Sequence, residues 1–242
     1  MWGIIPAAGM GSRIQPLAFS KELLPVGSYI TDGGERPRAV SEYLIERMVR
    51  GGVEKICFVI SPGKSDIVNY FGGQVLSAKT FYAVQPQPAG LCDAIFRALP
   101  LIPTDEHVCI GLPDTVWFPE DALARMPSGV LALLLFPVEH PENFDAVATD
   151  ASDEVSNIQV KSKGARTNWV WGALKMPGAT LAALHEIWRE RHDEYLGTLI
   201  NEYLARGGRA CGYKIGQAYV DVGTLNGYRE ALRLLDETRS SR

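Results

Sequence analysis

Short apolar runs alternate with amphipathic stretches along the first half of the chain. The apolar runs are bounded by Gly, Pro or polar residues, as buried strands typically are, and they fall at residues 2–5, 55–61, 80–84 and 108–112. Two of the stretches between them, residues 37–50 and 91–99, repeat their apolar positions at helical spacing. This alternation of strand and helix predicts a mostly parallel sheet that is covered by helices on both faces.

The second half of the chain contains more consecutive strand patterns. Apolar runs fall at residues 130–138, 169–176, 210–215 and 219–221, and a small antiparallel pair is expected from residues 147–148 and 158–161. Helical patterns occupy residues 179–191, 196–205 and 225–235. We therefore expect an α/β fold with a Rossmann-like, open, mostly parallel mixed sheet and a small strand-rich insertion. Without a visible linker or repeat, residues 1–242 are expected to form a single domain.

Residues 28–40 sit between the opening loop region and the first long helix. Residues 28–35 are polar and contain two glycines, which predicts an exposed excursion without regular structure. Pro37 suits the first turn of a helix, because its missing N–H would lack a partner there in any case. The helix is therefore expected to begin at Pro37 and to stop at Gly51.

The chain's composition excludes several classes of protein. Its 242 residues are 46% hydrophobic and 21% charged, with a net charge of −4 and no run rich in Lys or Arg, so a nucleic-acid partner is disfavoured. No apolar run approaches the ~20 residues of a membrane span, and the start does not resemble a signal peptide. Cys57, Cys92, Cys109 and Cys211 are far apart, as buried reduced thiols would be. We expect a cytoplasmic protein without a membrane partner. A homo-oligomer is compatible with the sequence.

A loop of small residues follows the first strand. Residues 7–12 read Ala-Ala-Gly-Met-Gly-Ser, and Arg13 and Lys21 come soon after them. Backbone N–H groups in such a loop can approach an anion closely, because Gly and Ala leave no bulky side chain in the way. The two cations would supply the positive charge that a polyphosphate needs. The pattern predicts binding of a nucleoside triphosphate or a similarly anionic ligand, although an ordinary Gly-rich turn would share the glycines.

Two other phosphate-binding motifs do not fit the sequence. The dinucleotide pattern G-x-G-x-x-G would need glycine where the chain has Ile14. Gly63, Lys64 and Ser65 match the end of a Walker A loop, but that loop would need glycine at Phe58. We interpret this second segment as a turn, with Ser65 capping a short helix.

Two acidic residues follow apolar strands and have glycine nearby. Asp114 comes after the run at residues 108–112, and Asp221 comes at the end of the run at residues 219–221. In open α/β sheets, ligands bind at the carboxyl ends of the strands. Two carboxylates there can share one Mg²⁺, whose other ligands are water and substrate phosphates. Taken singly, each acid also fits a helix cap or a turn residue.

These features together resemble the sugar-phosphate nucleotidyltransferases, in particular the glucose-1-phosphate thymidylyltransferase and uridylyltransferase group. The N-terminal motif of that family, A-A-G-x-G-[ST]-R followed by S-K-x-L-L-P, matches residues 7–13 and 20–25. Its Q-P-x-P-x-G-L segment matches residues 85–91, and its later acids match Asp114 and Asp221. The likeness extends over nearly the whole chain in the same order. It implies a nucleotide-diphospho-sugar transferase-like fold, with the strand-rich insertion binding the acceptor.

The resemblance also implies roles for individual residues. Arg13 and Lys21 would be catalytic and would hold the phosphates, and Asp114 and Asp221 would bind Mg²⁺. The nucleotide would be bound by Ala8, Gly9, Gly11, Ser12, Gln85 and Gly90, with Gln85 and Gly90 at the edge of a pyrimidine base. The acceptor, a sugar 1-phosphate, would be bound by Asp145, Lys161 and Gly172. A sugar phosphate is already ionised near neutral pH, so its attack on the α-phosphorus of dTTP or UTP needs no general base, and pyrophosphate would leave.

The acceptor half departs from the family pattern at two positions. Val160 replaces a glutamate that would bind sugar hydroxyls, and Asp145 stands where the family often has glycine. Asp145 can clash with a hexose, or bind a hydroxyl or amine of another acceptor. Trp169 and Trp171 share one strand face and fit either core packing or a wall of the acceptor pocket. Two alternatives stay open: a cytidylyltransferase for a non-sugar phosphate such as phosphocholine, and a non-catalytic nucleotide-binding regulator.

Overall fold

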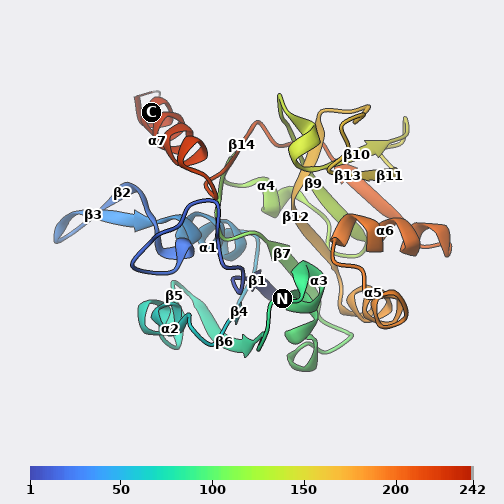
Figure 1. The fold of residues 1–242 in the computed structure, drawn as a ribbon, viewed down its shortest axis with the longest axis horizontal. Coiled ribbons are helices and arrows are strands. Elements are labelled where there is room, and N and C mark those ends of the chain that lie inside the picture. The colour runs from blue at the N-terminus through green and yellow to red at the C-terminus, as the bar shows by residue number, and fades with distance from the viewer. Residues whose placement is uncertain (241–242) are drawn as a thin grey trace.

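A central sheet organises the computed structural model, which describes residues 1–240 (Figure 1). Its main path runs in the order β11-β10-β12-β7-β1-β4-β6-β5. The strands of the first half are β1 (Trp2–Pro6), β4 (Lys55–Ile60), β5 (Gln74–Val75), β6 (Ala78–Val84) and β7 (His107–Gly111). Those of the second half are β9 (Leu131–Pro137), β10 (Asp145–Thr149), β11 (Val155–Val160), β12 (Trp169–Pro177) and β13 (Ala210–Tyr213).

The four strands β7, β1, β4 and β6 are neighbours and run parallel. Ile4 lies opposite Cys57 on one side and Ile110 on the other, and these three side chains are buried. Near-continuous apolar strands are typical of a parallel sheet that is covered on both faces. All four carboxyl ends therefore meet at the same edge of the sheet, where the candidate site lies.

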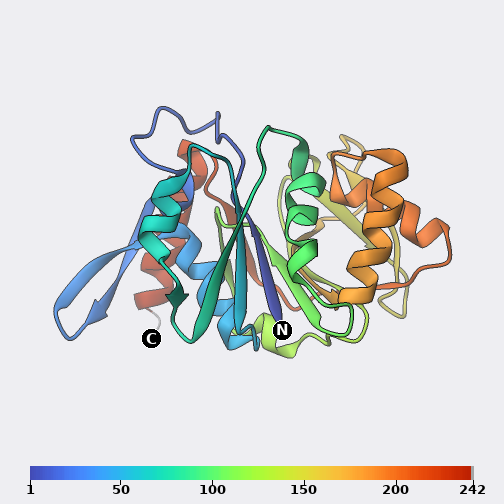
Figure 2. The same cartoon turned by 90° about the horizontal axis from the view of Figure 1, so that it is seen from below.

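Helices cover both faces of this sheet (Figure 2). On one face, apolar residues of α3 (Gly90–Arg97), α5 (Gly178–Arg191) and α6 (Leu196–Ala205) belong to one buried cluster with the sheet. On the other face, α1 (Val40–Arg50), α2 (Ser65–Phe71) and α4 (Ala122–Arg125) contribute to a second cluster. This arrangement confirms the predicted fold class of a mostly parallel mixed sheet between helices.

Strand β12 connects the parallel part of the sheet to the strand-rich insertion. Its second half pairs antiparallel with β7, its first half touches β10 at Val170, and β9 pairs along its other edge. Strands β10 and β11 form the predicted antiparallel pair, with Asp145 opposite Val160. Trp171 lies within β12 and is buried in the core, so its indole ring is packed rather than forming an open wall.

Two small antiparallel ribbons lie outside the main sheet. The first pairs β8 (Thr115–Phe118) with β14 (Ala218–Asp221). The second is a projecting hairpin of β2 (Pro25–Thr31) and β3 (Gly34–Ala39), which Figures 1 and 2 show extending from the body. A third apolar cluster joins both ribbons to α1 and to the terminal helix α7 (Leu225–Ser240).

The hairpin corrects two expectations about residues 28–40. Residues 28–35 are largely exposed, as predicted, but they form regular antiparallel pairs rather than an irregular excursion. Pro37 does not start the helix; it lies in β3 opposite Ser28, and α1 begins at Val40. Proline is tolerated in an edge strand because its missing N–H faces away from the partner strand. Pairing within the hairpin thus outweighed the preference of Pro37 for a helix start.

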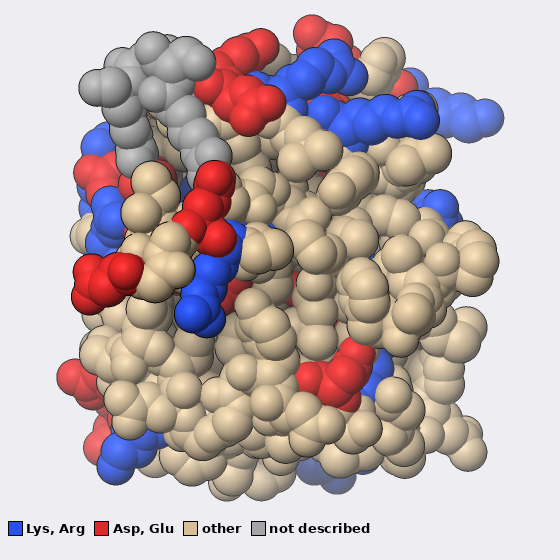
Figure 3. Space-filling view, turned by 90° about the vertical axis from the view of Figure 1, so that its left-hand side faces the viewer, with Lys and Arg blue, Asp and Glu red and all other residues tan. Residues whose placement is uncertain are grey.

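The cysteines and the surface agree with the composition. In the described part of the chain all four thiols are free, and burial raises the pKa of Cys57, Cys92 and Cys109 to about 12. Among residues 1–240, no helix is long and apolar enough to cross a membrane. On the face seen in Figure 3, Lys and Arg side chains stand beside Asp and Glu rather than forming one basic patch.

Candidate functional site

A cavity of about 340 Å³ opens where the parallel strands end. Segments that are distant in sequence line it together: the loop after β1, the short helix η1 (Lys21–Leu23), the segment after β6, and the ends of β7 and β14. Eight of the predicted site residues are among those lining it: Ala8, Gly9, Arg13, Lys21, Gln85, Gly90, Asp114 and Asp221. We call this cavity the nucleotide pocket, after the ligand that the resemblance predicts. Gly11 and Ser12 lie in the same loop but outside the pocket lining.

The loop at residues 7–12 is anchored at its first residue and open further on. The backbone N–H of Ala7 donates to the carbonyl of Val59 at 2.7 Å, which extends the β1–β4 ladder into the loop. A Cβ atom on Gly9 would meet nothing within 4 Å, so this glycine leaves space at the pocket wall. Gly11 has φ +63, and a Cβ there would come 2.7 Å from Cδ of Lys21. Gly11 therefore lets the stem of Lys21 pass close to the loop.

Lys21 reaches Asp114 across the nucleotide pocket. Its ammonium group forms an ion pair with Asp114 Oδ2, and both side chains are largely buried. Burial acts to lower the pKa of Lys21, but the attraction of Asp114 and the hydrogen bond to it outweigh burial, and the pKa is raised. Lys21 is therefore a fixed positive charge at neutral pH.

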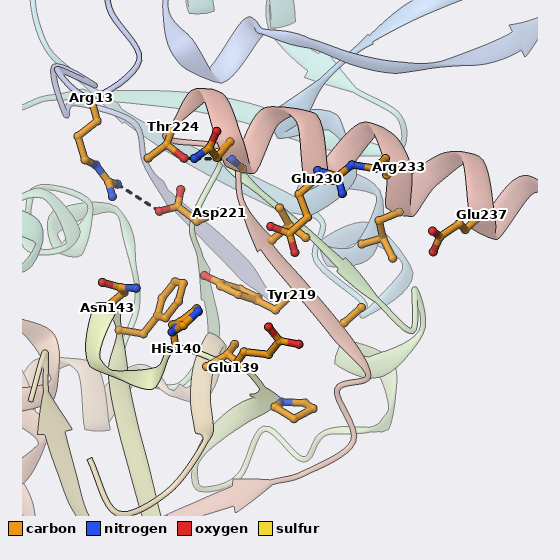
Figure 4. A pocket seen from close by; sticks show the side chains of 18 residues that line it. Arg13, Glu139, His140, Asn143, Tyr219, Asp221, Thr224, Glu230, Arg233 and Glu237 are labelled. Atoms are coloured by element: carbon orange, nitrogen blue, oxygen red, sulfur yellow. Dashed lines mark hydrogen bonds and ion pairs between the residues drawn. The ribbon is translucent and has the colours of Figure 1, made fainter. Parts of the chain in front are cut away.

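Arg13 forms a second ion pair, with Asp221 (Figure 4). Its Nη2 atom lies 3.1 Å from Asp221 Oδ2, while the N–H of Gly223 donates to the other carboxylate oxygen at 2.7 Å. A Cβ on Gly223 would come 2.7 Å from Asp221 Oδ1 and 2.9 Å from Arg13 Nη2, so a larger residue here would displace the ends of both side chains. The Arg13 side chain is 64% exposed, which leaves it able to move toward an incoming anion.

The β8–β14 ribbon explains why the two acids are neighbours. Asp221 lies opposite Thr115, the residue after Asp114, and the N–H of Val222 donates to the carbonyl of Asp114 at 2.8 Å. Both carboxylates line the nucleotide pocket. Within residues 1–240, no group of three or more His, Cys, Asp or Glu side chains could hold a metal ion. Two hard carboxylate oxygen donors fit Mg²⁺ only as part of a set completed by phosphates and water.

Gln85 presents a defined hydrogen-bonding group to the pocket. It is 4% exposed, and its Nε2 donates to Asp93 Oδ2 at 2.8 Å and to the Gly90 carbonyl at 3.1 Å. Both partners are acceptors, so the amide nitrogen has to face them. Asp93 is itself held by Arg97 at 2.8 Å. The side-chain oxygen of Gln85 is therefore the acceptor offered to a ligand.

The acceptor residues expected from the resemblance lie beside this pocket rather than in its lining. The indole N–H of Trp171 donates to Asp145 Oδ2 at 3.4 Å, and burial raises the pKa of Asp145 despite that bond and the nearby Lys161. The ammonium group of Lys161 lies 4.5 Å from the ring centre of Tyr195. A Cβ on Gly172 would come 2.7 Å from the Tyr219 ring, so the absence of a side chain there lets the ring pack against the strand. Their binding roles stay predictions.

A second cavity of about 810 Å³ lies on the other side of Tyr219, between the start of α7 and the segment around η3 (Pro141–Asn143). Four residues line both cavities: Arg13, Phe144, Tyr219 and Asp221. Figure 4 shows the Tyr219 ring below the Arg13–Asp221 pair. Burial first, and then the carboxylates of Asp221, Asp114 and Asp145, raise the pKa of Tyr219 well above its usual value. Tyr219 is a neutral phenol that separates the two cavities.

Comparison with known proteins identifies the family. A family model described as nucleotidyl transferase matches residues 2–238. The chain belongs to this family. The resemblance noted from the sequence is thereby confirmed. The loop at residues 7–12, the cations Arg13 and Lys21, and the acids Asp114 and Asp221 form the candidate site of a nucleotidyl transferase.

Several relatives share this likeness at low identity. A glucose-1-phosphate thymidylyltransferase from Mycolicibacterium smegmatis is 25% identical, over 96% of this chain and 81% of the relative. The bifunctional protein GlmU from Methanococcus maripaludis is 28% identical over 67% of this chain. This chain spans 36% of that protein and 58% of a Neisseria meningitidis glucose-1-phosphate thymidylyltransferase. The UTP-bound UGPase of Acinetobacter baumannii has the same fold, with a TM-score of 0.77, 20% identity, and 97% and 92% of the two chains covered.

Sequence reasoning missed the contacts of two side chains, Tyr219 and Lys64, and assigned the wrong role to a third, Ser65. Tyr219 was noted only as part of a strand, although it lines both cavities. Lys64, placed in a turn, proves to be a buried partner of the loop and of Glu22. Ser65 does not cap α2 as expected; it is the first residue of that helix, with Lys64 at the capping position and no side-chain cap bond. The Gly-Lys-Ser tripeptide was the available signal for Lys64.

Proposed function

We propose that this nucleotidyl transferase uses Mg²⁺ to transfer a uridylyl or thymidylyl group from UTP or dTTP to a sugar 1-phosphate. The products are a nucleoside diphosphate sugar and pyrophosphate. The family supports nucleotidyl transfer, and the names of the relatives that act on glucose 1-phosphate support the acceptor class. Arg13, Lys21, Asp114 and Asp221 together favour an enzyme over a binding module, because nucleotide binding alone would not need the whole set.

The orientation of Gln85 carries the choice of base. Its amide nitrogen is occupied by Asp93 and Gly90, so the oxygen is the atom left to accept a hydrogen bond from a ligand in the pocket. Uracil and thymine carry an N–H at N3, which can donate to that oxygen, whereas cytosine has an unprotonated nitrogen there. A cytosine base would place two acceptors against each other, with the penalty of an unmade hydrogen bond. This favours UTP or dTTP over CTP.

The proposed reaction needs alignment and charge neutralisation more than proton transfer. A phosphate oxygen of the acceptor attacks the α-phosphorus and forms the new P–O bond. The bond from that phosphorus to the oxygen bridging to the β-phosphate breaks, and pyrophosphate leaves with its electron pair. Lys21 would neutralise the α-phosphate and the incoming phosphate, and Arg13 would hold the β- and γ-phosphates. Mg²⁺, held by Asp114 and Asp221, would supply further charge stabilisation and orient the triphosphate.

The test is pyrophosphate release across a grid of UTP, dTTP, CTP, ATP and GTP with sugar 1-phosphates and phosphocholine, in the presence of Mg²⁺. We expect turnover with UTP or dTTP and a sugar 1-phosphate, and at least tenfold lower kcat/KM with CTP. Turnover with CTP and phosphocholine alone would replace the proposal with the cytidylyltransferase alternative. Binding of triphosphates without turnover for any pair would favour a non-catalytic role.

Gln85→Leu is the matched variant for the base. The leucine keeps the volume but offers no acceptor, so we expect the advantage of UTP and dTTP over CTP to shrink while ATP and GTP stay poor. An unchanged preference between pyrimidines would show that another group reads the base. Leu101→Gln, a change on an exposed side chain away from the pocket, serves as the control and should leave the preference as it is.

A further inference from the structure

The turn after β4 holds a buried ammonium group that the proposed chemistry does not use. Lys64 Nζ donates to both carboxylate oxygens of Glu22 at 2.8 Å and to the carbonyl of Ala7 at 2.7 Å. Lys64 is 9% exposed and Glu22 is 1% exposed. One buried cation therefore connects the first residue of the nucleotide loop with the residue next to Lys21.

A second contact from the same turn holds the other neighbour of Lys21. Asp66 accepts the backbone N–H of Ser20 at 2.6 Å and its hydroxyl at 2.7 Å. These bonds to Ser20 lower the pKa of Asp66 even though partial burial acts to raise it. The residues on each side of Lys21 are thus gripped from one turn, by Lys64 and by Asp66.

Lys21 itself points elsewhere. Ser20 and Glu22 face the turn, whereas Lys21 reaches across the nucleotide pocket to Asp114. The N–H of Leu23 donates to the carbonyl of Ser20 at 2.9 Å, so the short helix η1 keeps these directions fixed. The grip on the flanking residues therefore determines where the Lys21 backbone lies and which way its side chain leaves.

Stability alone is a weak reason for such a pair. Removing two charges from water costs more than their attraction returns unless further hydrogen bonds are made, and apolar replacements are often as stable. Here Glu22 is buried deeply enough that its pKa is raised by burial in spite of Lys64. An apolar pair could not make the hydrogen bond to the Ala7 carbonyl. This bond fixes the position of the loop at residues 7–12 relative to Lys21.

We infer that Lys64 and Asp66 are positioning residues, which fix Lys21 and the loop at residues 7–12 in the arrangement that a triphosphate requires. The inference rests on the proposed function for the ligand but not for the acceptor, because it concerns triphosphate binding and alignment alone. A displacement of about 1 Å in an aligned group can cost on the order of 10²-fold in rate. The segment at residues 63–65, which only resembles a Walker A loop, thus serves a phosphate site indirectly.

Two variants test this inference. Asp66→Asn keeps the shape of the side chain but replaces one acceptor of Ser20 with a donor group. Lys64→Met combined with Glu22→Gln removes both buried charges at once, so that neither is left unpaired. We expect kcat/KM for the triphosphate to fall about 10- to 100-fold in each, with melting temperatures within a few degrees of the wild type. The control is Lys55→Met with Glu106→Gln. It removes the ion pair at the opposite end of β4, in which Lys55 Nζ lies 2.5 Å from Glu106 Oε1, and should leave kcat/KM unchanged.

A cycle with Lys21→Met separates positioning from general weakening. If Asp66 acts through Lys21, Asp66→Asn should reduce kcat about tenfold or more in the wild type and by less than about twofold in the Lys21→Met background. Equal losses in both backgrounds would overturn the inference, as would a stable Asp66→Asn protein with unchanged kcat and KM. If the charge-free double variant does not fold, Asp66→Asn alone decides.

The dissociation constant of the triphosphate, measured by titration calorimetry, distinguishes this inference from the proposed function. A wild type that binds UTP or dTTP but transfers to no sugar 1-phosphate would contradict the proposed function. The positioning inference would then stand if Lys64→Met/Glu22→Gln weakens that binding tenfold or more, and fall if the binding is unchanged.

Discussion

Arg13 and Asp221 are separated by 208 positions in the sequence, yet their side chains form an ion pair at 3.1 Å. Lys21 and Asp114 form the equivalent pair, and all four residues line the nucleotide pocket. Each acid proposed to hold a metal is thus balanced by a cation proposed to hold phosphate. A triphosphate and Mg²⁺ can therefore bind together without bringing like charges into contact. Arg13 and Lys21 can turn to the phosphates, and the two acids can turn to the metal.

Asp221→Asn should impair turnover without unfolding the protein. We expect kcat/KM to fall on the order of 10²- to 10³-fold, as is usual when a charged contact to the transition state is lost. The stability cost should be small, because Arg13 is largely exposed and such pairs contribute about 0–1 kcal/mol. Pyrophosphate release and thermal unfolding measure the two effects. Asp121→Asn, which breaks the exposed pair with Arg125, should change neither.

Asp114→Asn should differ from Asp221→Asn in its effect on stability. Lys21 would lose its partner in a largely buried position, so we expect a loss of about 1–3 kcal/mol in addition to the loss of turnover. Chemical denaturation compares the free energies of unfolding of the two variants. A fully active Asp114→Asn protein would exclude the proposed metal role.

Divalent metal should bind weakly to the protein alone and more tightly together with a triphosphate. Both acids are engaged by cations in the absence of ligand, and two carboxylates give Mg²⁺ too few ligands by themselves. Mn²⁺ titration followed by electron paramagnetic resonance, with and without UTP, measures this directly. Tight binding of Mn²⁺ without nucleotide, or tight binding that survives Asp114→Asn/Asp221→Asn, would contradict it.

Gly9→Ala should weaken triphosphate binding while the protein stays stable. A Cβ at this position meets no protein atom within 4 Å, so the cost should fall on the ligand that occupies the space. Gly63→Ala provides the matched control, since its Cβ also meets nothing within 4 Å and Gly63 does not line the pocket. Gly11→Ala should instead destabilise the fold by about 1–3 kcal/mol, because of its positive φ and its contact with Lys21. Calorimetric titration with UTP and thermal unfolding separate the three variants.

The stabilisation from Asp66 should disappear in acid. Its pKa in the folded state lies below the usual value, so the carboxylate contributes fully above about pH 4 and its contribution is lost as pH falls through the folded-state pKa. We therefore expect the wild type to melt at a higher temperature than Asp66→Asn from pH 5 to 8, and the difference to shrink as the pH falls below about 4. A difference that grows on acidification would mean that the pKa is shifted the other way.

Local patterns were sufficient to predict the parallel core and most of the nucleotide pocket. The loop at residues 7–12, Gln85 and Asp114 all follow apolar strands, and parallel strands bring their carboxyl ends to one edge. Asp221 reaches that edge by another route, through the small ribbon with β8. The hydrophobic pattern does not predict this pairing, because each of the two strands has only four residues.

The side chains that sequence reasoning missed depend on distant contacts. Lys64 is 42 positions from Glu22 and 57 from Ala7, so its partners could not be inferred from neighbouring residues. Pro37 is ambiguous for a related reason, since a helix start and an edge strand both tolerate it. Asp145 is ambiguous in chemistry: its carboxylate is now seen bound to the Trp171 indole, a contact between two strands that its own segment does not encode.

The β8–β14 ribbon has a consequence for how the protein is made. One of its strands precedes residue 119 and the other follows residue 217, so the two acids cannot meet until residue 221 has been synthesised. A nascent polypeptide that ends before this strand contains the glycine loop and the parallel strands but lacks half of the proposed magnesium site. Until Asp221 has been made, Arg13 also lacks its ion-pair partner, although Lys21 and Asp114 are already present.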